Sequence, residues 1–242
     1  MNTIYETTYH VGVINTDLFG LCRPSSVMDF MQEAAGEHTI HLGIGQEDLL
    51  EKHAIWMLVR LRYTLHRPIY GGEDLTVKTW GRPPRGAFVV RDFLLYVGQE
   101  CVGEAVSVWV LGDAQNHTLL RAEDILPPEG AHQPEHPMEK PGKIRMPKEM
   151  KPVGERRIGY SETDSNGHAN NTRYADYACD AIAFETQRGK YLRQMQITYS
   201  TECLVGQTIR MLCEKEEEIY YVRGVDKDGK SHFDIRMELA EI

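Results

Sequence analysis

Hydrophobic and polar positions follow two different periods along this chain. Between residues 24 and 36, apolar residues recur three and four positions apart, which predicts an amphipathic helix that opens near Pro24 and presents Val27, Phe30, Met31, Ala34 and Ala35 on one face. A short run predicts a strand at residues 9–13. Runs rich in Val, Leu and aromatic residues then predict four further strands, at residues 55–66, 74–80, 87–97 and 101–111.

The same order of elements returns later in the chain. A strand is predicted at residues 156–160, followed by a helix that begins near Asn170 and has Tyr174, Tyr177, Ala178, Ala181 and Ile182 on its apolar face. Four more strands are predicted at residues 193–201, 207–214, 218–225 and 232–239. Each half therefore reads as one strand, one helix and a four-stranded antiparallel sheet, an α+β arrangement.

Proline marks the boundary between these halves. Seven of the eleven prolines lie within residues 127–152, where their fixed φ and missing N–H disfavour regular structure. We therefore expect an N-terminal half at residues 1–126, a linker at 127–152 and a C-terminal half at 153–242. Side-by-side pairing of the halves would bury their sheet edges, as in a fused dimer; two independent domains on a flexible linker are the alternative.

Composition narrows the functional classes. With 242 residues and 41% hydrophobic content, the chain can bury a sizeable core, and its net charge of −9 argues against nucleic acid as a general partner. The N-terminus has no basic and apolar leader, and no window is apolar enough to span a membrane, so a cytoplasmic protein is expected. Five widely spaced cysteines without a CxxC pair argue against a disulfide framework and a structural zinc site.

Candidate chemistry is distributed unequally between the halves. When Asp17 is superposed on Asp164, Gly20 pairs with Gly167; when Gly72 is superposed on Gly206, Pro68 pairs with Glu202. Asp164, Asn166 and His168 precede the second helix, whereas the matching first-half positions are Asp17, Phe19 and Leu21.

The second-half loop, which contains Asp164, Asn166 and His168, has side chains suited to acid–base chemistry. The N-terminus of the helix that follows this loop could stabilise a developing oxyanion. Asp164 and Asn166 taken alone are ordinary turn residues, and His168 alone could be a surface histidine. The loss of the polar residues from the paired copy favours function. The loop contains a single histidine, and no HxxxH or HExxH spacing gives His168 a second histidine ligand, so no metal and no cofactor is expected.

Cys203 offers a competing nucleophile. Together with His168 and Asn166 it imitates a papain-like set. Adjacent strand residues point to opposite faces, so Glu202 and Cys203 should not both face the site, and we favour Glu202.

These residues resemble a known family. Thr163-Asp164-x-Asn166-x-His168-x-Asn170-Asn171-x-x-Tyr174, followed by Glu202-Cys203, looks like the catalytic half of the acyl-acyl carrier protein (acyl-ACP) thioesterases, which are tandem hot-dog proteins. The first half is similar to that family's N-terminal hot dog at Gly43-x-Gly45, Trp56-x-Leu58-x-Arg60, Lys78-Thr79-Trp80, Gly86-x-x-x-x-Arg91-Asp92-Phe93 and Ser107-x-Trp109-Val110.

The resemblance implies hydrolysis of the thioester that joins a fatty acyl chain to a carrier's phosphopantetheine arm. It assigns catalysis to Asp164, Asn166, His168 and Glu202, and it implies an acyl pocket in the first half. Which carboxylate attacks and which orients water stays open at this point. The preferred hypothesis is that Asp164 and Glu202 position or activate water, while His168 and Asn166 steer the proton and the carbonyl. Candidate substrate-binding residues are Val27, Met28, Met31, Trp56, Trp80 and Asn170.

A carrier-protein partner requires a local positive patch, because carriers and this chain are both acidic. One candidate is residues 139–157, with seven basic residues against three acidic ones. Another is the cluster of Arg82, Arg85 and Arg91. The alternatives left open are an acyl-CoA thioesterase, a hydratase-type hot-dog enzyme and a non-catalytic acyl-thioester-binding protein; a homodimer is also open.

Overall fold

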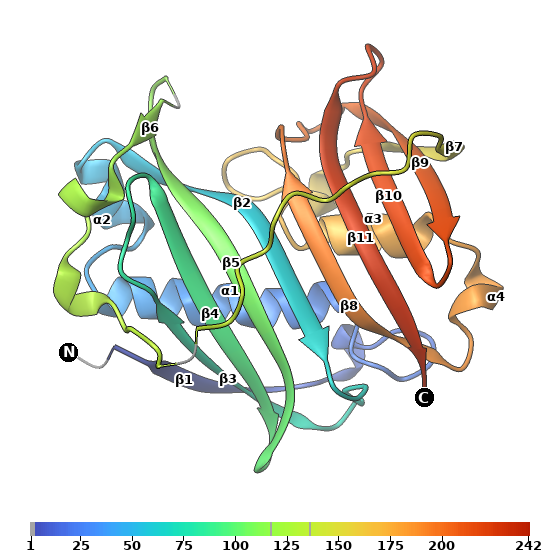
Figure 1. Cartoon of the computed structure of the whole chain (residues 1–242), viewed down its shortest axis with the longest axis horizontal. Helices are drawn as coiled ribbons and strands as arrows, with labels where there is room; N and C mark the ends of the chain where they lie inside the picture. The colour runs from blue at the N-terminus through green and yellow to red at the C-terminus, as the bar shows by residue number, and fades with distance from the viewer. Residues whose placement is uncertain (1–2, 117, 136) are drawn as a thin grey trace.

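Two similar halves join edge to edge in one antiparallel sheet (Figure 1). The computed structural model describes residues 3–116, 118–135 and 137–242; Met1, Asn2, His117 and His136, which fall in the predicted first half and linker, lie outside this description. The strand order is β1-β3-β4-β5-β2-β8-β11-β10-β9-β7, and β6 pairs with β5. The strands are β1 (Tyr5–His10), β2 (Ala54–Leu65), β3 (Asp74–Gly81), β4 (Phe88–Val97), β5 (Glu100–Asp113), β6 (Leu119–Leu120), β7 (Lys151–Arg157), β8 (Lys190–Tyr199), β9 (Thr208–Glu216), β10 (Ile219–Val225) and β11 (Ser231–Glu241).

The strand order is symmetric about the centre of the sheet, where β2 pairs with β8. Outward from β2 come β5, β4, β3 and β1, and outward from β8 come their counterparts β11, β10, β9 and β7. Arg60 on β2 pairs with Thr198 on β8, and the register continues to Thr64 and Gln194. The edges that each half would leave unpaired are thereby satisfied by the other half. The structure is a tandem hot-dog fold packed as a pseudo-dimer.

Helices cover one face of the sheet. The predicted first helix is confirmed as α1 (Pro24–His41), and the second as the shorter α3 (Arg173–Asp180); α2 (Gln46–Glu51) and α4 (Phe184–Gln187) were not predicted. Val27, Met31 and Ala34 of α1 are buried in the same core as Tyr63 of β2 and Ile197 of β8. Because the core is continuous across the junction, the halves form one packed unit.

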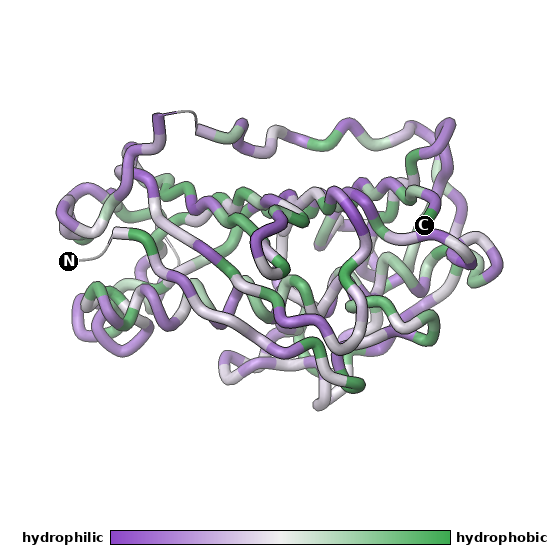
Figure 2. The backbone as a smooth tube through the Cα atoms, turned by 90° about the horizontal axis from the view of Figure 1, so that it is seen from below, coloured by the Kyte–Doolittle hydropathy of each residue, from purple (hydrophilic) through white to green (hydrophobic). Residues whose placement is uncertain are grey.

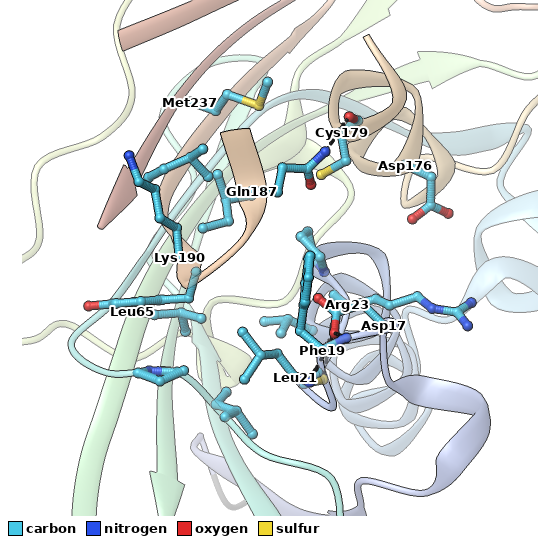
Figure 3. A pocket seen from close by; sticks show the side chains of 18 of the residues that line it. Asp17, Phe19, Leu21, Arg23, Leu65, Asp176, Cys179, Gln187, Lys190 and Met237 are labelled. Carbon is cyan, nitrogen blue, oxygen red and sulfur yellow. Dashed lines mark hydrogen bonds between the residues drawn. The ribbon is translucent and has the colours of Figure 1, made fainter. Parts of the chain in front are cut away.

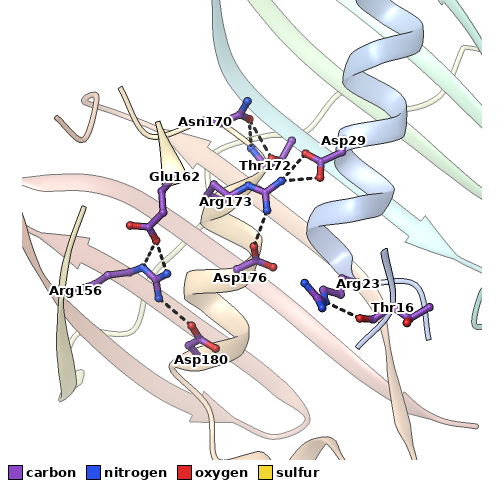
Figure 4. Close-up of polar contacts among 10 residues, drawn as sticks. All are labelled: Thr16, Arg23, Asp29, Arg156, Glu162, Asn170, Thr172, Arg173, Asp176 and Asp180. Atoms are coloured by element: carbon purple, nitrogen blue, oxygen red, sulfur yellow. Dashed lines mark hydrogen bonds and ion pairs between the residues drawn. The ribbon is translucent and has the colours of Figure 1, made fainter. Parts of the chain in front are cut away.

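A charged contact also joins the helices. Arg173 at the start of α3 donates from Nη2 to both carboxylate oxygens of Asp29 on α1, at 2.8 and 2.6 Å, and from Nη1 to Asp176 at 3.3 Å (Figure 4). This contact ties the first turn of α3 to α1 and so aligns the halves.

The Pro-rich segment crosses the sheet face opposite α1 and α3 (Figures 1 and 2). Its carbonyl groups accept hydrogen bonds from the sheet: Arg62 donates to Glu139 O at 2.6 Å, and Gln196 donates to Gly142 O at 2.7 Å. Long polar side chains on the outer face of β2 and β8 thus hold the segment in place.

The first strand of each half begins earlier than predicted. β1 ends at His10 and β7 ends at Arg157, and the apolar residues expected to continue them enter 3₁₀ turns at Val13–Asn15 and Tyr160–Glu162. In each turn a side chain accepts the N–H of the preceding glycine, Asn15 for Gly12 and Glu162 for Gly159. The alternation of apolar residues indicated a strand, but these local hydrogen bonds turn the chain instead.

Candidate active site

Asp164 organises the loop before α3. Its Oδ1 accepts the N–H groups of Asn166 at 2.9 Å and His168 at 3.4 Å, and Asn166 Nδ2 lies 3.5 Å from Oδ2. The backbone closes the same turn, since Asp164 N donates to His168 O and Gly167 N donates to Asp164 O. Gly167 has φ +78°, a left-handed conformation that favours glycine. The loop therefore places the side chains of Asn166 and His168 by short-range hydrogen bonds.

The first half contains the same loop with its aspartate but without counterparts of the Asn166 and His168 side chains. Asp17 Oδ1 accepts the N–H groups of Phe19 at 2.8 Å and Leu21 at 3.0 Å, and Gly20 has φ +79°. Both loops also form the same hydrogen bond to the segment that follows the first long strand of their half: Cys22 N donates to Ile69 O at 2.7 Å, after β2, and Ala169 N donates to Cys203 O at 2.8 Å, after β8. This pairing equates Pro68 with Glu202, as the sequence comparison predicts. The aspartate is common to both loops, whereas the other polar groups occur in one.

Glu202 lies against this loop. Its Oε2 is 3.5 Å from His168 Nε2, and the two side chains are 47% and 26% exposed, so both are accessible to a ligand from solvent. His168 also pairs through its backbone with Leu204, just after Glu202. The structure thus brings Asp164, Asn166, His168 and Glu202 together, although 34 residues separate His168 from Glu202.

Cys203 faces the opposite way. It is fully buried, its N–H donates to Tyr174 Oη at 3.3 Å, and burial raises the pKa of its thiol to about 11. A thiolate is the reactive form, so burial disfavours Cys203 as a nucleophile at neutral pH. Its histidine neighbour is His232, at 3.6 Å, and not His168.

His232 is a member of this region that the sequence reasoning missed. It lies on β11, is 3% exposed, and its Nδ1 is 2.9 Å from Glu202 O. Because a carbonyl oxygen can only accept, Nδ1 carries the proton in this contact, and Nε2 can then accept from Gln207 Nε2 at 3.1 Å. His232 therefore holds the backbone that carries Glu202. No local sequence signal pointed to it, since it comes from a strand 30 residues away.

Family models of known proteins match both halves of the chain. The family model described as acyl-ACP thioesterase N-terminal domain matches residues 2–127, and the one described as acyl-ACP thioesterase C-terminal domain matches residues 147–239. The chain belongs to the acyl-ACP thioesterase family. As a member, it is a thioester hydrolase that acts on fatty acyl-ACP.

Solved structures of acyl-ACP thioesterases share the fold. An acyl-ACP thioesterase from Bacteroides thetaiotaomicron superposes with a TM-score of 0.89 at 23% identity, covering 99% of this chain and 98% of that one. A 12:0-ACP thioesterase from Umbellularia californica has a TM-score of 0.83 at 17% identity, covering 100% and 99%. A search of curated protein sequences found no match.

The candidate acyl-binding residues of this thioesterase lie in several places. Met28 and Met31 are buried in the main core, whereas Trp56 belongs to a smaller cluster, where it packs edge-on against Trp109 and donates to Ile44 O. Trp80 packs edge-on against His132 of the linker segment. Val27 is fully buried in the main core, at the edge of a cavity of about 700 Å³ between the halves (Figure 3).

Asn170 has a local structural contact. Its Oδ1 accepts the N–H and the hydroxyl of Thr172, both at 3.0 Å, at the start of α3 (Figure 4). This is the pattern of a helix-initiating asparagine.

One predicted basic patch is wrong. Arg91 is 7% exposed and packs on the helix side of the sheet, where its Nη1 contacts His38 Nδ1 at 3.1 Å and Thr79 Oγ1 at 3.2 Å. Arg82 is engaged by buried Asp92 and by Met138 O. Arg91 lies on β4, whereas Arg82 and Arg85 lie in the connection between β3 and β4, and the side chains of Arg91 and Arg82 are engaged by other protein groups, so the three arginines do not form one free basic surface.

Two further findings concern the described residues as a whole. Outside Met1, Asn2, His117 and His136, no helix combines the length and hydrophobicity of a membrane span. Over the same part of the chain, no three His, Cys, Asp or Glu side chains group closely enough to hold a metal ion.

Proposed function

We propose that this thioesterase hydrolyses its substrate with Glu202 and His168 as the proton-transfer pair, Asn166 as the donor to the carbonyl oxygen, and Asp164 as the residue that positions the loop. The 3.5 Å approach of His168 Nε2 to Glu202 Oε2, on an accessible surface, is the observation that carries this proposal. A carboxylate beside an imidazole can pass a proton at neutral pH.

The reaction balances with these groups alone. Glu202 takes a proton from water as the water oxygen bonds to the thioester carbonyl carbon. The carbonyl electron pair moves onto oxygen, which accepts a hydrogen bond from the Asn166 amide. When the tetrahedral intermediate collapses, the carbon–sulfur bond breaks, and His168, having received the proton from Glu202, delivers it to the leaving thiolate. The products are a free fatty acid and the carrier's thiol.

Asp164 has a different part in this scheme. Both loop amides occupy its Oδ1, and Asp17 makes the same bonds in the half without the other polar residues. Its role is therefore to hold Asn166 and His168, and the base is Glu202.

Substitution of Glu202 tests the scheme. Glu202→Gln should lower kcat by about 10²–10⁴, the usual contribution of general acid–base catalysis, and leave the melting temperature within about 1 °C, because the side chain is half exposed. Cys203→Ala is the matched control at the adjacent position and should keep near-normal turnover. Near-normal hydrolysis by Glu202→Gln, or an inactive but folded Cys203→Ala enzyme, would contradict the assignment.

The carrier is proposed to dock on the remaining basic patch. Lys140, Lys143, Arg145 and Lys148 are exposed along the linker segment, whereas Arg156 is engaged by Glu162 and Asp180 (Figure 4). Charge reversal of Lys148 should raise KM for acyl-ACP, with a steep salt dependence, and leave hydrolysis of a small acyl thioester unchanged. An unchanged KM would remove this surface as the docking site.

The preferred thiol carrier, the cellular location and the assembly state are also part of the proposal. We expect a cytoplasmic enzyme that prefers acyl-ACP; comparison of kcat/KM for one acyl group on ACP and on CoA tests this preference. A higher value for CoA would favour an acyl-CoA thioesterase, and substrate binding without thiol release would indicate a non-catalytic binding protein. Sedimentation of the purified chain tests whether it forms a homodimer.

A further inference from the structure

The second part of the linker segment forms a strap over the sheet. The strap, residues 137–150, contains no helix or strand and runs along the sheet face opposite α1 and α3 before β7 begins (Figures 1 and 2). Within it every third position turns toward the sheet: Pro141 and Ile144 are buried, and Met138 and Pro147 are half-buried. A period of three is typical of polyproline II, an extended helix without internal hydrogen bonds.

The same period sets the basic side chains of the strap on its solvent side. Lys140 and Lys143 are three residues apart, as are Arg145 and Lys148, and all four are exposed. At the rise of polyproline II, the members of each pair are spaced about 9 Å along the strap. The strap has only two acidic residues against these four cations. Its solvent side therefore complements an acidic protein surface.

Side chains of the sheet hold the strap by its carbonyl groups. Arg62 Nη2 donates to Glu139 O at 2.6 Å, and Gln196 Nε2 donates to Gly142 O at 2.7 Å. The two donors face each other across the junction of the halves, since Arg62 on β2 pairs with Gln196 on β8. Because the two bonds lie on either side of Lys140 and beside Lys143, they fix the backbone that presents these ammonium groups.

A third anchor lies at the start of the strap. Arg82 Nη2 donates to Met138 O at 2.6 Å, and the guanidinium is itself held by two bonds to the fully buried carboxylate of Asp92, at 2.7 and 2.6 Å. A cavity of about 200 Å³ adjoins Met138 and Glu139, between the strap and the sheet. Hydrogen bonds to the strap carbonyls, rather than close packing, therefore hold this part of the strap.

The strap also leads toward the half that contains Glu202. It continues into β7, and the residue just after β7 is bonded to the loop that follows Glu202: Ile158 N donates to Gln207 O at 2.9 Å, and Gly206 N donates to Ile158 O at 2.8 Å. A protein bound along the strap would therefore extend toward the half that contains the proposed catalytic loop.

We propose that the strap is a prearranged docking surface for the acidic acyl carrier, and that Arg62 and Gln196 are positioning residues that hold its cations in place. The inference rests on the proposed docking of the carrier on the basic residues of the strap. It adds the side chains beneath the strap, which no sequence motif indicated. A released strap would keep its charge but lose backbone freedom when the carrier binds, and that loss weakens the complex.

Release of the strap is the first test. The double variant Arg62→Ala/Gln196→Ala should raise KM for acyl-ACP about threefold to tenfold and change kcat less than about twofold, since neither residue belongs to the proposed catalytic group. Gln194→Ala is the matched control. Gln194 lies two residues earlier on the same face of β8, but it bonds to Thr64 and Arg236 instead of the strap, so this variant should keep the wild-type KM.

Proteolysis and salt distinguish positioning from a general loss of stability. Trypsin should cut the folded double variant after Lys143 or Arg145 faster than it cuts Gln194→Ala, because the strap is no longer tied to the sheet. In high salt, where attraction between the strap and the carrier is screened, the KM values of the wild type and the double variant should converge. A loss of stability alone would not make the difference in KM depend on salt.

The outcomes separate this inference from the docking proposal. Faster cleavage with an unchanged KM for acyl-ACP would overturn the positioning role and leave docking on the strap intact. Unchanged cleavage would show that the two bonds do not hold the strap, which overturns the positioning role as well. An unchanged KM after charge reversal of Lys148 would instead reject docking on the strap itself.

Discussion

Asp17 and Asp164 occupy the same position in the matching loops of the two halves. Substituting each of them separates a structural role of Asp164 from a catalytic one. In Asp164→Ala the amides of Asn166 and His168 lose their acceptor, and in Asp17→Ala the amides of Phe19 and Leu21 lose theirs. Since each pair of bonds is partly exposed to solvent, we expect either substitution to cost about 1–2 kcal/mol of unfolding free energy. For a chain of this size that lowers the melting temperature by about 2–8 °C.

Turnover then distinguishes the roles. Asp164→Asn keeps an oxygen that can accept both amides, so it should retain most of the stability and lose less than about tenfold in kcat. Asp164→Ala should lose much more, because Asn166 and His168 are no longer held. The assay is thiol release from acyl-ACP at saturating substrate, with thermal melting of each variant, and Asp17→Ala reports the cost of the loop bonds alone. If Asp164→Asn is as stable as wild type yet loses 10²–10⁴ in kcat, the Asp164 carboxylate itself reacts and the reasoning fails.

Three further predictions concern residues around this site and in the fold. His232→Ala should lower kcat with little change in KM and shift the pH dependence of kcat, because the backbone carbonyl of Glu202 loses its hydrogen-bond donor. An unchanged pH dependence in thiol-release assays would contradict this. Native Cys203 should react with iodoacetamide slowly, at a rate that rises tenfold per pH unit toward its pKa of about 11, as mass spectrometry can follow; fast reaction near neutral pH would show that the thiol is not buried. Gly224→Ala should destabilise by about 1–3 kcal/mol, because a Cβ there would lie 2.2 Å from Phe233 Cε1, whereas Gly36→Ala in the open interior of α1 should stabilise by about 0.5–1 kcal/mol; equal melting temperatures would refute this contrast.

Much of the fold is readable from local pattern. The helix at Pro24 and the eight long strands follow from helical and strand periodicity, and the repeat itself follows from the order of those elements. The early ends of β1 and β7 were missed because the side chains of Asn15 and Glu162 stabilise turns that hydrophobic alternation does not report.

The sequence also predicted part of the proposed site, because three of its residues are close together in the chain. Asp164, Asn166 and His168 lie within one loop, and comparison with the first half shows that Asn166 and His168 stand where the shared turn there has Phe19 and Leu21. His232 could not be found this way. Its relation to Glu202 depends on how β11 packs beside β8, a long-range pairing that no local pattern records.

By itself, the sequence determined that the chain repeats one α+β unit, that a Pro-rich segment separates the copies, and that only one copy carries the polar loop. These are properties of residues within a few positions of one another, where spacing and turn chemistry act directly. Only the tertiary structure decided that β2 and β8 join the copies into one sheet, and that Cys203 is buried while Glu202 is accessible. Strand pairing and burial depend on which distant surfaces pack together, so they emerge only when the whole chain is folded.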